Sequence, residues 1–353
     1  MTGSDMMQAV RLCAPADLRL QDVTRPRPRP GEVLLKVLAA GICQTDVHIR
    51  RAADSRTPGG TILGHEIAGE VADLGAGVLS WRPGDRVVVH PCWACGTCRA
   101  CRAGRENECH ATLGRRHPPA TPGVTENGGM AGYMVAPASA LFGIGDLDPV
   151  VAAPLTDAAL TPYRAIMSCR DLLKPGATVI VIGLGGLGMM ALQILRAIST
   201  VRAIGIDRSG AAMDLCAEWS DELLFPDEST VERIRAATGG VGAEVVLDFV
   251  GVDATLDIAT RTVARGGAIR VVGLSGGSLQ FVARSANNPL PRGVTIMCPY
   301  SGTYNDLAEV ISMARAGAIL PIVETFPLSG ALDALDRLEA GTIRGRAVLL
   351  PHG

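Results

Sequence analysis

The stretch 178-TVIVIGLGGLG-188 determines the fold class of this 353-residue chain. Thr178 to Ile182 is a continuous apolar and largely β-branched run, which predicts a strand that is buried on both faces. Gly183-Leu184-Gly185-Gly186-Leu187-Gly188 matches the pattern G-x-G-x-x-G and leads into a helical run, Gly188 to Ile198. A strand, a glycine turn and a helix in this order are typical of a dinucleotide-binding unit.

The glycines of this turn have different expected roles. Gly183 permits the tight turn, Gly185 lets the backbone approach a pyrophosphate, and Gly188 allows the helix to pack closely on the strand. The helix N-terminus then presents free N–H groups and a partial positive charge to the phosphates. We therefore expect the cofactor to lie against the turn, whose candidate binding residues also include Gly186 and Leu187.

Asp207 ends the next predicted strand, about twenty residues downstream, as the dinucleotide pattern requires. A carboxylate there accepts hydrogen bonds from the ribose 2′-OH and repels a 2′-phosphate, so NAD(H) is favoured over NADP(H). The alternative is an aspartate that only caps a helix or turn. Arg208 leaves NADP(H) open as an alternative cofactor, because a guanidinium at that position could accept a 2′-phosphate.

The surrounding pattern predicts two kinds of domain. From about Thr156, further apolar strands at 201–206, 244–249 and 268–272 alternate with helical stretches, which indicates a parallel sheet covered on both faces. The first 150 residues are rich in turns and predict strands at 32–39, 67–74 and 86–90. The tail from Asn305 predicts a helix, a strand, a second helix and a final strand at 347–350. The chain is therefore of the α/β class.

Composition and charge narrow the range of partners. The net charge of −2 gives no electrostatic reason to expect nucleic acid or an anionic membrane surface. Met1 to Val10 has no signal-peptide core. Val179 to Leu195 carries no charge, but its glycines favour a strand, a turn and a helix over a membrane span. We expect a cytoplasmic protein.

Four cysteines lie at a spacing typical of a metal site: Cys95, Cys98, Cys101 and Cys109. Four thiolates so close in sequence can close a tetrahedral zinc shell without an open position, which predicts a structural zinc. An iron–sulfur cluster is the alternative, because its ligand pattern is partly similar. Cys92 is a fifth candidate, which we expect to be a free buried thiol.

Several motifs together resemble the zinc-dependent medium-chain alcohol dehydrogenase family. They are Gly41-Ile42-Cys43-Gln44-Thr45-Asp46, Gly64-His65-Glu66-Ile67-Ala68-Gly69 and Gly84-Asp85-Arg86-Val87, followed in the family's order by the four cysteines and the glycine turn. Pro154-Leu155-Thr156-Asp157 and Thr161-Pro162-Tyr163 are most similar to bacterial NAD-dependent secondary-alcohol dehydrogenases. The resemblance spans essentially the whole chain.

The resemblance implies a domain arrangement. A GroES-like β-rich catalytic domain would comprise residues 1–155 and 300–353, with the structural zinc lobe at 92–110. A doubly wound Rossmann domain that binds NAD would comprise residues 156–299. Family members are dimers or tetramers that pair through an edge strand, here expected at Val294 to Cys298, and we expect a homotetramer.

The resemblance also implies a second, catalytic zinc with Cys43, His65 and Asp157 as ligands, so two zinc ions per chain. Asp157 stands where many relatives have cysteine; the alternative is an aspartate at a helix N-terminus. Glu66 is similar to a family carboxylate that approaches the metal during ligand exchange. Asp46 is expected to accept a hydrogen bond from the His65 imidazole.

Proton and hydride transfer are implied in the same way. The family's proton relay would run from Thr45 through the cofactor ribose to His48, whose imidazole exchanges with solvent. Thr161 matches a position that packs against the nicotinamide. Arg346 resembles a basic residue that reaches the pyrophosphate.

The resulting prediction is a zinc-dependent oxidoreductase that transfers a hydride between NAD(H) and a small alcohol or ketone, with a secondary alcohol favoured over an aldehyde. One alternative is a reductase of the same fold that acts on an imine, an enal or a formaldehyde adduct. The other is a protein that keeps the fold as a binding module without turnover. The sequence leaves the substrate open.

Overall fold

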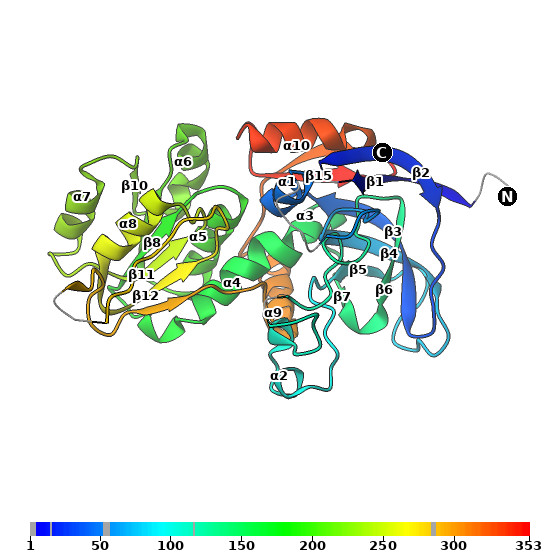
Figure 1. Cartoon of the computed structure of the whole chain (residues 1–353), viewed down its shortest axis with the longest axis horizontal. Coiled ribbons are helices and arrows are strands. Elements are labelled where there is room, and N and C mark those ends of the chain that lie inside the picture. Colours follow the sequence, from blue (N-terminus) through cyan, green and yellow to red (C-terminus); the bar gives the residue numbers. More distant parts are fainter. Residues whose placement is uncertain (1–4, 15, 52–56, 116, 284–286) are drawn as a thin grey trace. The chain divides into compact units, whose positions relative to one another are not determined.

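The computed structural model describes residues 5–14, 16–51, 57–115, 117–283 and 287–353 (Figure 1). The chain divides into two compact units, which are described separately. The first comprises Met1–Leu160, Ser301–Ala316 and Pro321–Gly353, and the second comprises Thr161–Tyr300 and Gly317–Leu320. The short return of residues 317–320 into the second unit is absent from the domain boundaries expected from the sequence.

The first unit is built on a seven-stranded sheet with the order β14-β15-β3-β4-β5-β7, in which β6 also pairs with β3. All neighbours are antiparallel except β14 and β15. The strands predicted at 32–39, 67–74, 86–90 and 347–350 are confirmed, with ends shifted by one or two residues. The strands are β3 (Glu32–Gly41), β4 (Glu66–Leu74), β5 (Arg86–Val89), β6 (Tyr133–Pro137), β7 (Leu141–Gly143), β14 (Val323–Pro327) and β15 (Arg346–Leu350).

An N-terminal hairpin was not expected from the sequence. It consists of β1 (Met6–Ala14) and β2 (Asp17–Thr24), which pair antiparallel. Val10, Leu12 and Leu18 are buried and belong to the main apolar core of the first unit. Apolar and charged residues alternate at 10–12 in β1 and at 17–20 in β2, and this period of two is the signal from which the hairpin could have been predicted.

Five α-helices accompany this sheet among the described residues of the first unit: α1 (Gln44–Arg50), α2 (Arg99–Arg102), α3 (Pro149–Pro154), α9 (Tyr304–Arg315) and α10 (Ala331–Glu339). Val47 and Ile49 of α1 lie in the same apolar core as Ala334 and Leu335 of α10. Helix α3 packs in a second apolar cluster with Leu307 and Ile311 of α9. These contacts fix the elements that carry the candidate site residues.

Residues 149–167 form a helical run with an unusual centre. Helix α3 continues into a π-helical turn, Leu155–Ala159, and then into α4 (Leu160–Met167). Pro154 and Pro162 have no N–H to donate and crowd the carbonyl four residues before them, so a regular α-helical ladder is interrupted at both positions. A π turn accommodates one additional residue at such an interruption. Asp157 lies within this turn.

The second unit is a six-stranded parallel sheet with the order β10-β9-β8-β11-β12-β13. All residues of β8 are buried, so this strand is covered on both faces, as predicted. The strands are β8 (Thr178–Ile182), β9 (Arg202–Ile206), β10 (Glu222–Leu224), β11 (Ala243–Asp248), β12 (Val263–Val271) and β13 (Thr295–Met297). The helices between them are α5 (Gly186–Ile198), α6 (Gly210–Cys216), α7 (Thr230–Ala237) and α8 (Asp253–Thr262).

Two details of this sheet differ from or extend the expectation. Strand β12 begins five residues earlier than the predicted 268–272, because Gly266, at a φ of 74°, lets the strand continue through a register shift. The uncharged stretch 179–195 forms β8, the glycine turn and most of α5. Within the described ranges, no helix has the length and apolar character needed to cross a membrane.

Candidate zinc and dinucleotide sites

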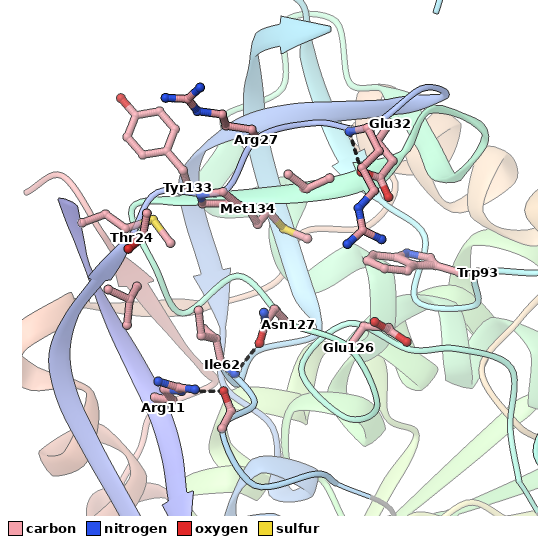
Figure 2. Close-up of a pocket in the computed structure, with 17 residues that line it drawn as sticks. Arg11, Thr24, Arg27, Glu32, Ile62, Trp93, Glu126, Asn127, Tyr133 and Met134 are labelled. Atoms are coloured by element: carbon pink, nitrogen blue, oxygen red, sulfur yellow. Dashed lines mark hydrogen bonds between the residues drawn. The ribbon is translucent and has the colours of Figure 1, made fainter. Parts of the chain in front are cut away.

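A cavity of about 400 Å³ lies in the first unit, at the side of the N-terminal hairpin (Figure 2). Its lining includes Arg11 from β1, Thr24 from β2, Tyr133 and Met134 from β6, and Trp93. None of the predicted zinc ligands or catalytic residues lines it. The candidate metal sites are instead two side-chain clusters elsewhere in the first unit. The candidate cofactor site is the glycine turn of the second unit.

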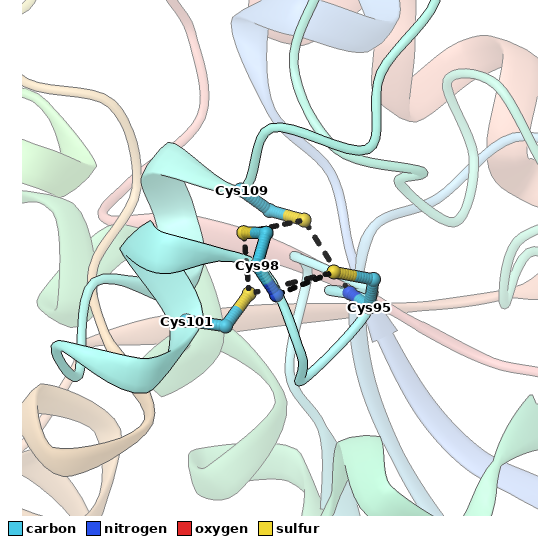
Figure 3. Close-up of side chains that lie close together, drawn as sticks. All are labelled: Cys95, Cys98, Cys101 and Cys109. Atoms are coloured by element: carbon cyan, nitrogen blue, oxygen red, sulfur yellow. Dashed lines mark hydrogen bonds between the residues drawn. The ribbon is translucent and has the colours of Figure 1, made fainter.

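The four predicted cysteines converge on one point (Figure 3). The Sγ atoms of Cys98 and Cys101 lie 3.5 Å apart, and those of Cys95 and Cys101 lie 4.0 Å apart. Cys98 and Cys109 are also separated by 4.0 Å. Thiolates at about 2.3 Å from zinc in a tetrahedron have sulfur–sulfur edges of about 3.8 Å, whereas a disulfide would be near 2 Å. The donor set therefore fits a zinc ion held by four thiolates.

Backbone amides donate to the same sulfurs. Cys98 N–H donates to Cys95 Sγ at 3.4 Å, and Ala111 N–H donates to Cys109 Sγ at 3.4 Å. His110 contributes its amide to Cys98 Sγ, and none of these contacts involves its imidazole. N–H donors stabilise the charged thiolate over the neutral thiol, which is the form that binds metal.

Cys92 is not part of this group. It is fully buried, and burial raises the pKa of its thiol to about 12. Its backbone is held by two neighbours: His90 Nδ1 accepts from Cys92 N–H at 3.0 Å, and Tyr304 Oη donates to the Cys92 carbonyl at 3.3 Å. The free, buried thiol expected from the sequence is therefore confirmed.

A second cluster brings together Cys43, His65, Glu66 and Asp157, with one ligand atom of each within 4.8 Å of the others. Cys43 is the N-cap of α1, His65 immediately precedes β4, and Asp157 lies in the π turn. Cys43 Sγ lies 3.3 Å from Asp157 Oδ2, and His65 Nε2 lies 3.6 Å from the same oxygen. Three residues that are far apart in sequence thus present a sulfur, a nitrogen and an oxygen to a common point.

The donor set fits a zinc ion. Zinc binds thiolate, imidazole and carboxylate at about 2.0 to 2.3 Å, which corresponds to separations between ligand atoms of about 3.3 to 3.8 Å in a tetrahedron. Three protein ligands leave a fourth position for substrate. His65 Nδ1 and Asp46 Oδ1 are both buried without a hydrogen-bond partner among the described residues and face each other at 3.8 Å. This geometry places Asp46 where a carboxylate can orient the imidazole of a zinc ligand.

The electrostatic field of this cluster favours a cation. Burial alone would lower the pKa of His65, but the charge of Asp46 and hydrogen bonding to Asp157 outweigh it and raise that pKa well above the usual value. Burial raises the pKa of Glu66 to about 7, against the opposing charge of Arg346. A site that draws a proton onto an imidazole in this way also attracts a metal ion.

Arg346, at the start of β15, pairs with both carboxylates of the cluster. Its guanidinium contacts Glu66 through Nε and Nη2 and lies 3.3 Å from Asp157 Oδ2. The residue is 4% exposed. Gly41 provides the space for this arrangement, because a β-carbon at position 41 would overlap Glu66 Oε2. The sequence motif contains Gly41, but this role requires the strand register and could not be read from the motif alone.

The remaining predicted catalytic residues, Thr45, Asp46 and His48, lie on α1. Asp46 Oδ2 accepts from the Cys43 N–H at 2.9 Å, so the same carboxylate caps the helix and faces His65. Thr45 Oγ1 lies 3.8 Å from Cys43 Sγ. His48 follows Thr45 by three residues, which places both on one face of the helix, and both are partly exposed.

In the second unit, the glycine turn has the geometry that the pattern predicts. Gly183 has a φ of 86°, which side-chain-bearing residues rarely adopt, and a β-carbon at Gly188 would overlap the carbonyl oxygen of Gly183. Gly185 is the N-cap of α5 and has no side-chain cap. A β-carbon there would meet no atom within 4 Å, so the helix N-terminus opens onto free space. Free N–H groups at this position can bind a pyrophosphate.

Asp207 lies directly beside this turn. Its Oδ2 accepts from Leu184 N–H at 2.7 Å, and its Oδ1 accepts from Ser209 N–H at 2.7 Å. Each oxygen keeps a further lone pair that a ribose hydroxyl could use. Arg208 is exposed, and Thr161 is buried in the first turn of α4.

Comparison with known proteins agrees with this geometry. Residues 29–146 match the alcohol dehydrogenase GroES-like domain, and residues 186–316 match the zinc-binding dehydrogenase domain. The chain is 34% identical to an NAD-dependent alcohol dehydrogenase of Sulfurisphaera tokodaii over 98% of this chain and 100% of that protein. It is 33% identical to a D-arabinose 1-dehydrogenase (NADP(+)) of Saccharolobus solfataricus over 95% of this chain and 94% of that protein.

A solved structure gives the same result for the fold. The alcohol dehydrogenase of the hyperthermophilic archaeon Aeropyrum pernix has a TM-score of 0.89 and 32% identity, with 98% of this chain and 100% of that chain covered. These relatives do not single out the bacterial enzymes that the motifs suggested. The GroES-like and Rossmann folds expected from the sequence are confirmed, and the chain belongs to the family of zinc-binding, NAD-dependent medium-chain alcohol dehydrogenases.

Proposed function

We propose that this protein oxidises a small secondary alcohol, or reduces the corresponding ketone, at a zinc ion held by Cys43, His65 and Asp157. The observation that carries the proposal is the convergence of Cys43 Sγ and His65 Nε2 on Asp157 Oδ2, at 3.3 Å and 3.6 Å. A separate four-cysteine cluster supplies a closed structural site, so the three-ligand cluster is the one with room for substrate. The first unit would then be the catalytic domain and the second the cofactor domain.

Zinc at this site would polarise the substrate oxygen as a Lewis acid, and NAD⁺ would accept the hydride. The chain's own residues handle the proton. Thr45 Oγ1, beside Cys43 Sγ, would accept the proton of the substrate hydroxyl while its own hydroxyl proton passes through the cofactor ribose towards His48. His48, three residues further along the same helix face and partly exposed, would exchange the proton with solvent.

Asp46, Glu66 and Arg346 would hold the ligands in place. Asp46 fixes the position of Cys43 through the backbone amide and orients the ring of His65. Arg346 pairs with Glu66 and Asp157, which limits the negative charge around the metal. Its expected contact with the cofactor pyrophosphate remains a prediction, since the guanidinium here is bound to carboxylates. Glu66 is available to approach the metal only if that ion pair opens.

For the cofactor, we infer that the turn from Gly183 to Gly188 binds the pyrophosphate and that Thr161 packs against the nicotinamide. The carboxylate of Asp207 would bind the ribose hydroxyls and select NAD(H). The relative from Saccharolobus solfataricus is named for NADP(+), so this preference has to be measured for each member.

We further infer a cytoplasmic homotetramer, with a dimer as the alternative. The support is strand β13 (Thr295–Met297), the last strand of the six-stranded sheet, where Ile296 is 41% exposed. An apolar edge strand with unpaired backbone groups favours pairing with a second copy. Light scattering at micromolar concentration should give the mass of a tetramer. A monomer mass would contradict the inference.

The test of the proposed function combines turnover with a metal count. NADH formation at 340 nm, followed across primary and secondary alcohols, should be fastest with a secondary alcohol. The native protein should hold two zinc ions per chain, and Asp157→Ala should lose one of them together with at least about 10²-fold in kcat/KM. Asp146→Ala, at an exposed aspartate, is the matched control and should change neither. Two zinc ions and full activity in Asp157→Ala would refute the ligand set.

A further inference from the structure

Helix α1 carries Thr45 and His48 but is only seven residues long. A helix of this length is not stable by itself, so its orientation depends on tertiary contacts at both ends. At the N-terminal end, Asp46 caps the amide of Cys43. The contacts at the C-terminal end come from a distant part of the chain, helix α10, which contains none of the proposed catalytic or ligand residues.

Arg50, in the last turn of α1, forms a two-pronged ion pair with α10. Its Nη1 lies 2.6 Å from Asp336 Oδ1, and its Nη2 lies 2.5 Å from Glu339 Oε2. Arg51 also pairs with Glu339. Gln44, at the start of α1, donates from Nε2 to the Leu338 carbonyl at 3.4 Å. Polar contacts to α10 therefore extend along the whole of α1.

The pair between Arg50 and Glu339 is partly buried, whereas Asp336 and Arg51 are mostly exposed. The side chain of Arg50 is 18% exposed and that of Glu339 is 26% exposed, although Asp336 is more open at 69%. The apolar residues Val47 and Ile49 pack in the same core as Leu335 on the adjoining face. Isolated surface pairs contribute little, but a low-exposure network with a guanidinium fork holds a defined geometry.

We propose that Arg50 is a positioning residue for catalysis: its ion pairs with Asp336 and Glu339 fix α1 against α10 and thereby set the orientation of Thr45 and His48. This inference rests on the proposed function of those two side chains. A helix of seven residues is about 10 Å long and rotates as one body. The ion pairs of Arg50 with Asp336 and Glu339 are called the clamp below. Loss of the clamp therefore displaces Thr45 and His48, while Asp46 still holds the end of α1 next to Cys43.

The test compares five variants on the zinc-loaded protein, including a triple variant that combines Arg50→Ala with both α10 changes. Arg50→Ala removes the clamp from the α1 side, and Asp336→Asn with Glu339→Gln removes its charge from the α10 side. Arg337→Ala is the matched control, because Arg337 lies on α10 as well but pairs with Glu324 at 2.6 Å and not with α1. Arg50→Lys keeps the charge but not the fork and should recover part of the loss.

The expected result for Arg50→Ala is a kcat about 10-fold lower, within the roughly 10²-fold that small misplacements cost. KM for the alcohol should change little, because the loss concerns the transition state. The α10 double variant should lower kcat at least as much, because it also removes the pair between Arg51 and Glu339. The triple variant should match the double variant, since the Arg50 ion pairs are already absent there. Zinc content should stay at the wild-type value, and Arg337→Ala should keep full kcat.

Hydrogen exchange provides a readout that is independent of turnover. The amides of residues 44–51 should exchange several-fold faster in Arg50→Ala than in wild type and Arg337→Ala. A kcat within twofold of wild type, additive losses in the triple variant, or loss of zinc in step with activity would each overturn the proposal. An inactive wild-type protein would refute the proposed function; unchanged exchange in Arg50→Ala would then refute the clamp separately.

Discussion

Gly41 and Glu66 face each other across the β3–β4 pair so closely that a β-carbon on Gly41 would overlap the Glu66 carboxylate. That carboxylate is buried and paired with Arg346. The variant Gly41→Ala should therefore push Glu66 away from Arg346 and destabilise the fold by about 1 to 3 kcal/mol, as overpacked sites do. Urea unfolding monitored by circular dichroism measures the change.

Gly59→Ala is the control for this variant. Gly59 has no positive φ, and its nearest neighbour for a new β-carbon is at 3.9 Å. The free energy of unfolding should stay within about 0.5 kcal/mol of wild type. If both variants unfold at the same urea concentration, the tight fit at Gly41 is not a determinant of stability.

Substitution of one cysteine in the four-cysteine cluster should remove the zinc ion that this cluster binds. Cys98→Ser removes one of four thiolates, so the zinc count should fall from two per chain to one. The melting temperature should fall with it, because binding of a structural zinc contributes directly to folding. Cys13→Ser, at an exposed cysteine outside both clusters, should leave metal content and melting temperature unchanged. Retention of two zinc ions in Cys98→Ser would show that Cys98 is not a ligand.

Asp207 allows a specificity test. Asp207→Asn keeps an oxygen that can accept from the Leu184 amide but removes the charge that repels a 2′-phosphate. The ratio of kcat/KM for NAD⁺ to that for NADP⁺ should fall by about 10-fold or more, equivalent to at least about 1.4 kcal/mol. Asp221→Asn neutralises a carboxylate that accepts from Ala203 in the same sheet, and should keep the wild-type ratio. An unchanged ratio in Asp207→Asn would assign cofactor selection to another residue.

Burial lowers the pKa of His90 to about 4 from an ordinary value of 6.5. Between these values the unfolded chain binds the proton and the folded chain does not, so stability rises with pH and is lost as pH falls from 6.5 to 4. The contribution is about 3 kcal/mol. The neighbouring Cys92 thiol and Tyr304 hydroxyl, whose pKa values are raised to about 12, do not titrate in this range.

His90→Asn isolates this effect, since an amide oxygen can still accept from the Cys92 N–H and does not titrate. Urea unfolding at a series of pH values from 7 to 4 should show a smaller loss of stability in this variant than in wild type. Acid release of zinc affects both proteins equally and cancels in the difference. Parallel curves would mean that folding does not lower the pKa of His90.

Much of this structure could be predicted because the sequence signals were local. The buried strand Thr178–Ile182 and the glycine turn after it follow from apolar content and backbone freedom, and both are present as expected. The four cysteines lie within fifteen residues, so their convergence needed little knowledge of the fold. The N-terminal hairpin also has a local signal, the alternation of apolar and charged residues around Val10 and Leu18.

The remaining features depend on how distant segments pair. Glu66 meets Arg346 because β3 lies between β4 and β15 in the sheet, which neither motif encodes. Arg50 meets Asp336 across almost the whole chain for the same reason. Asp157 was expected as a ligand only through a family resemblance. It lies in the first turn of the π-helical segment, whereas the N-cap of α3 is Asp148.

The π turn between Pro154 and Pro162 has a consequence for how this enzyme can vary. Because the prolines already break the regular ladder there, the Asp157 carboxylate is presented from a segment whose backbone is not a regular α-helix. A change of ligand from carboxylate to thiolate needs a single substitution here, and that substitution also removes the ion pair with Arg346. The preference of the metal site for harder or softer metal ions thus depends on the residue at position 157.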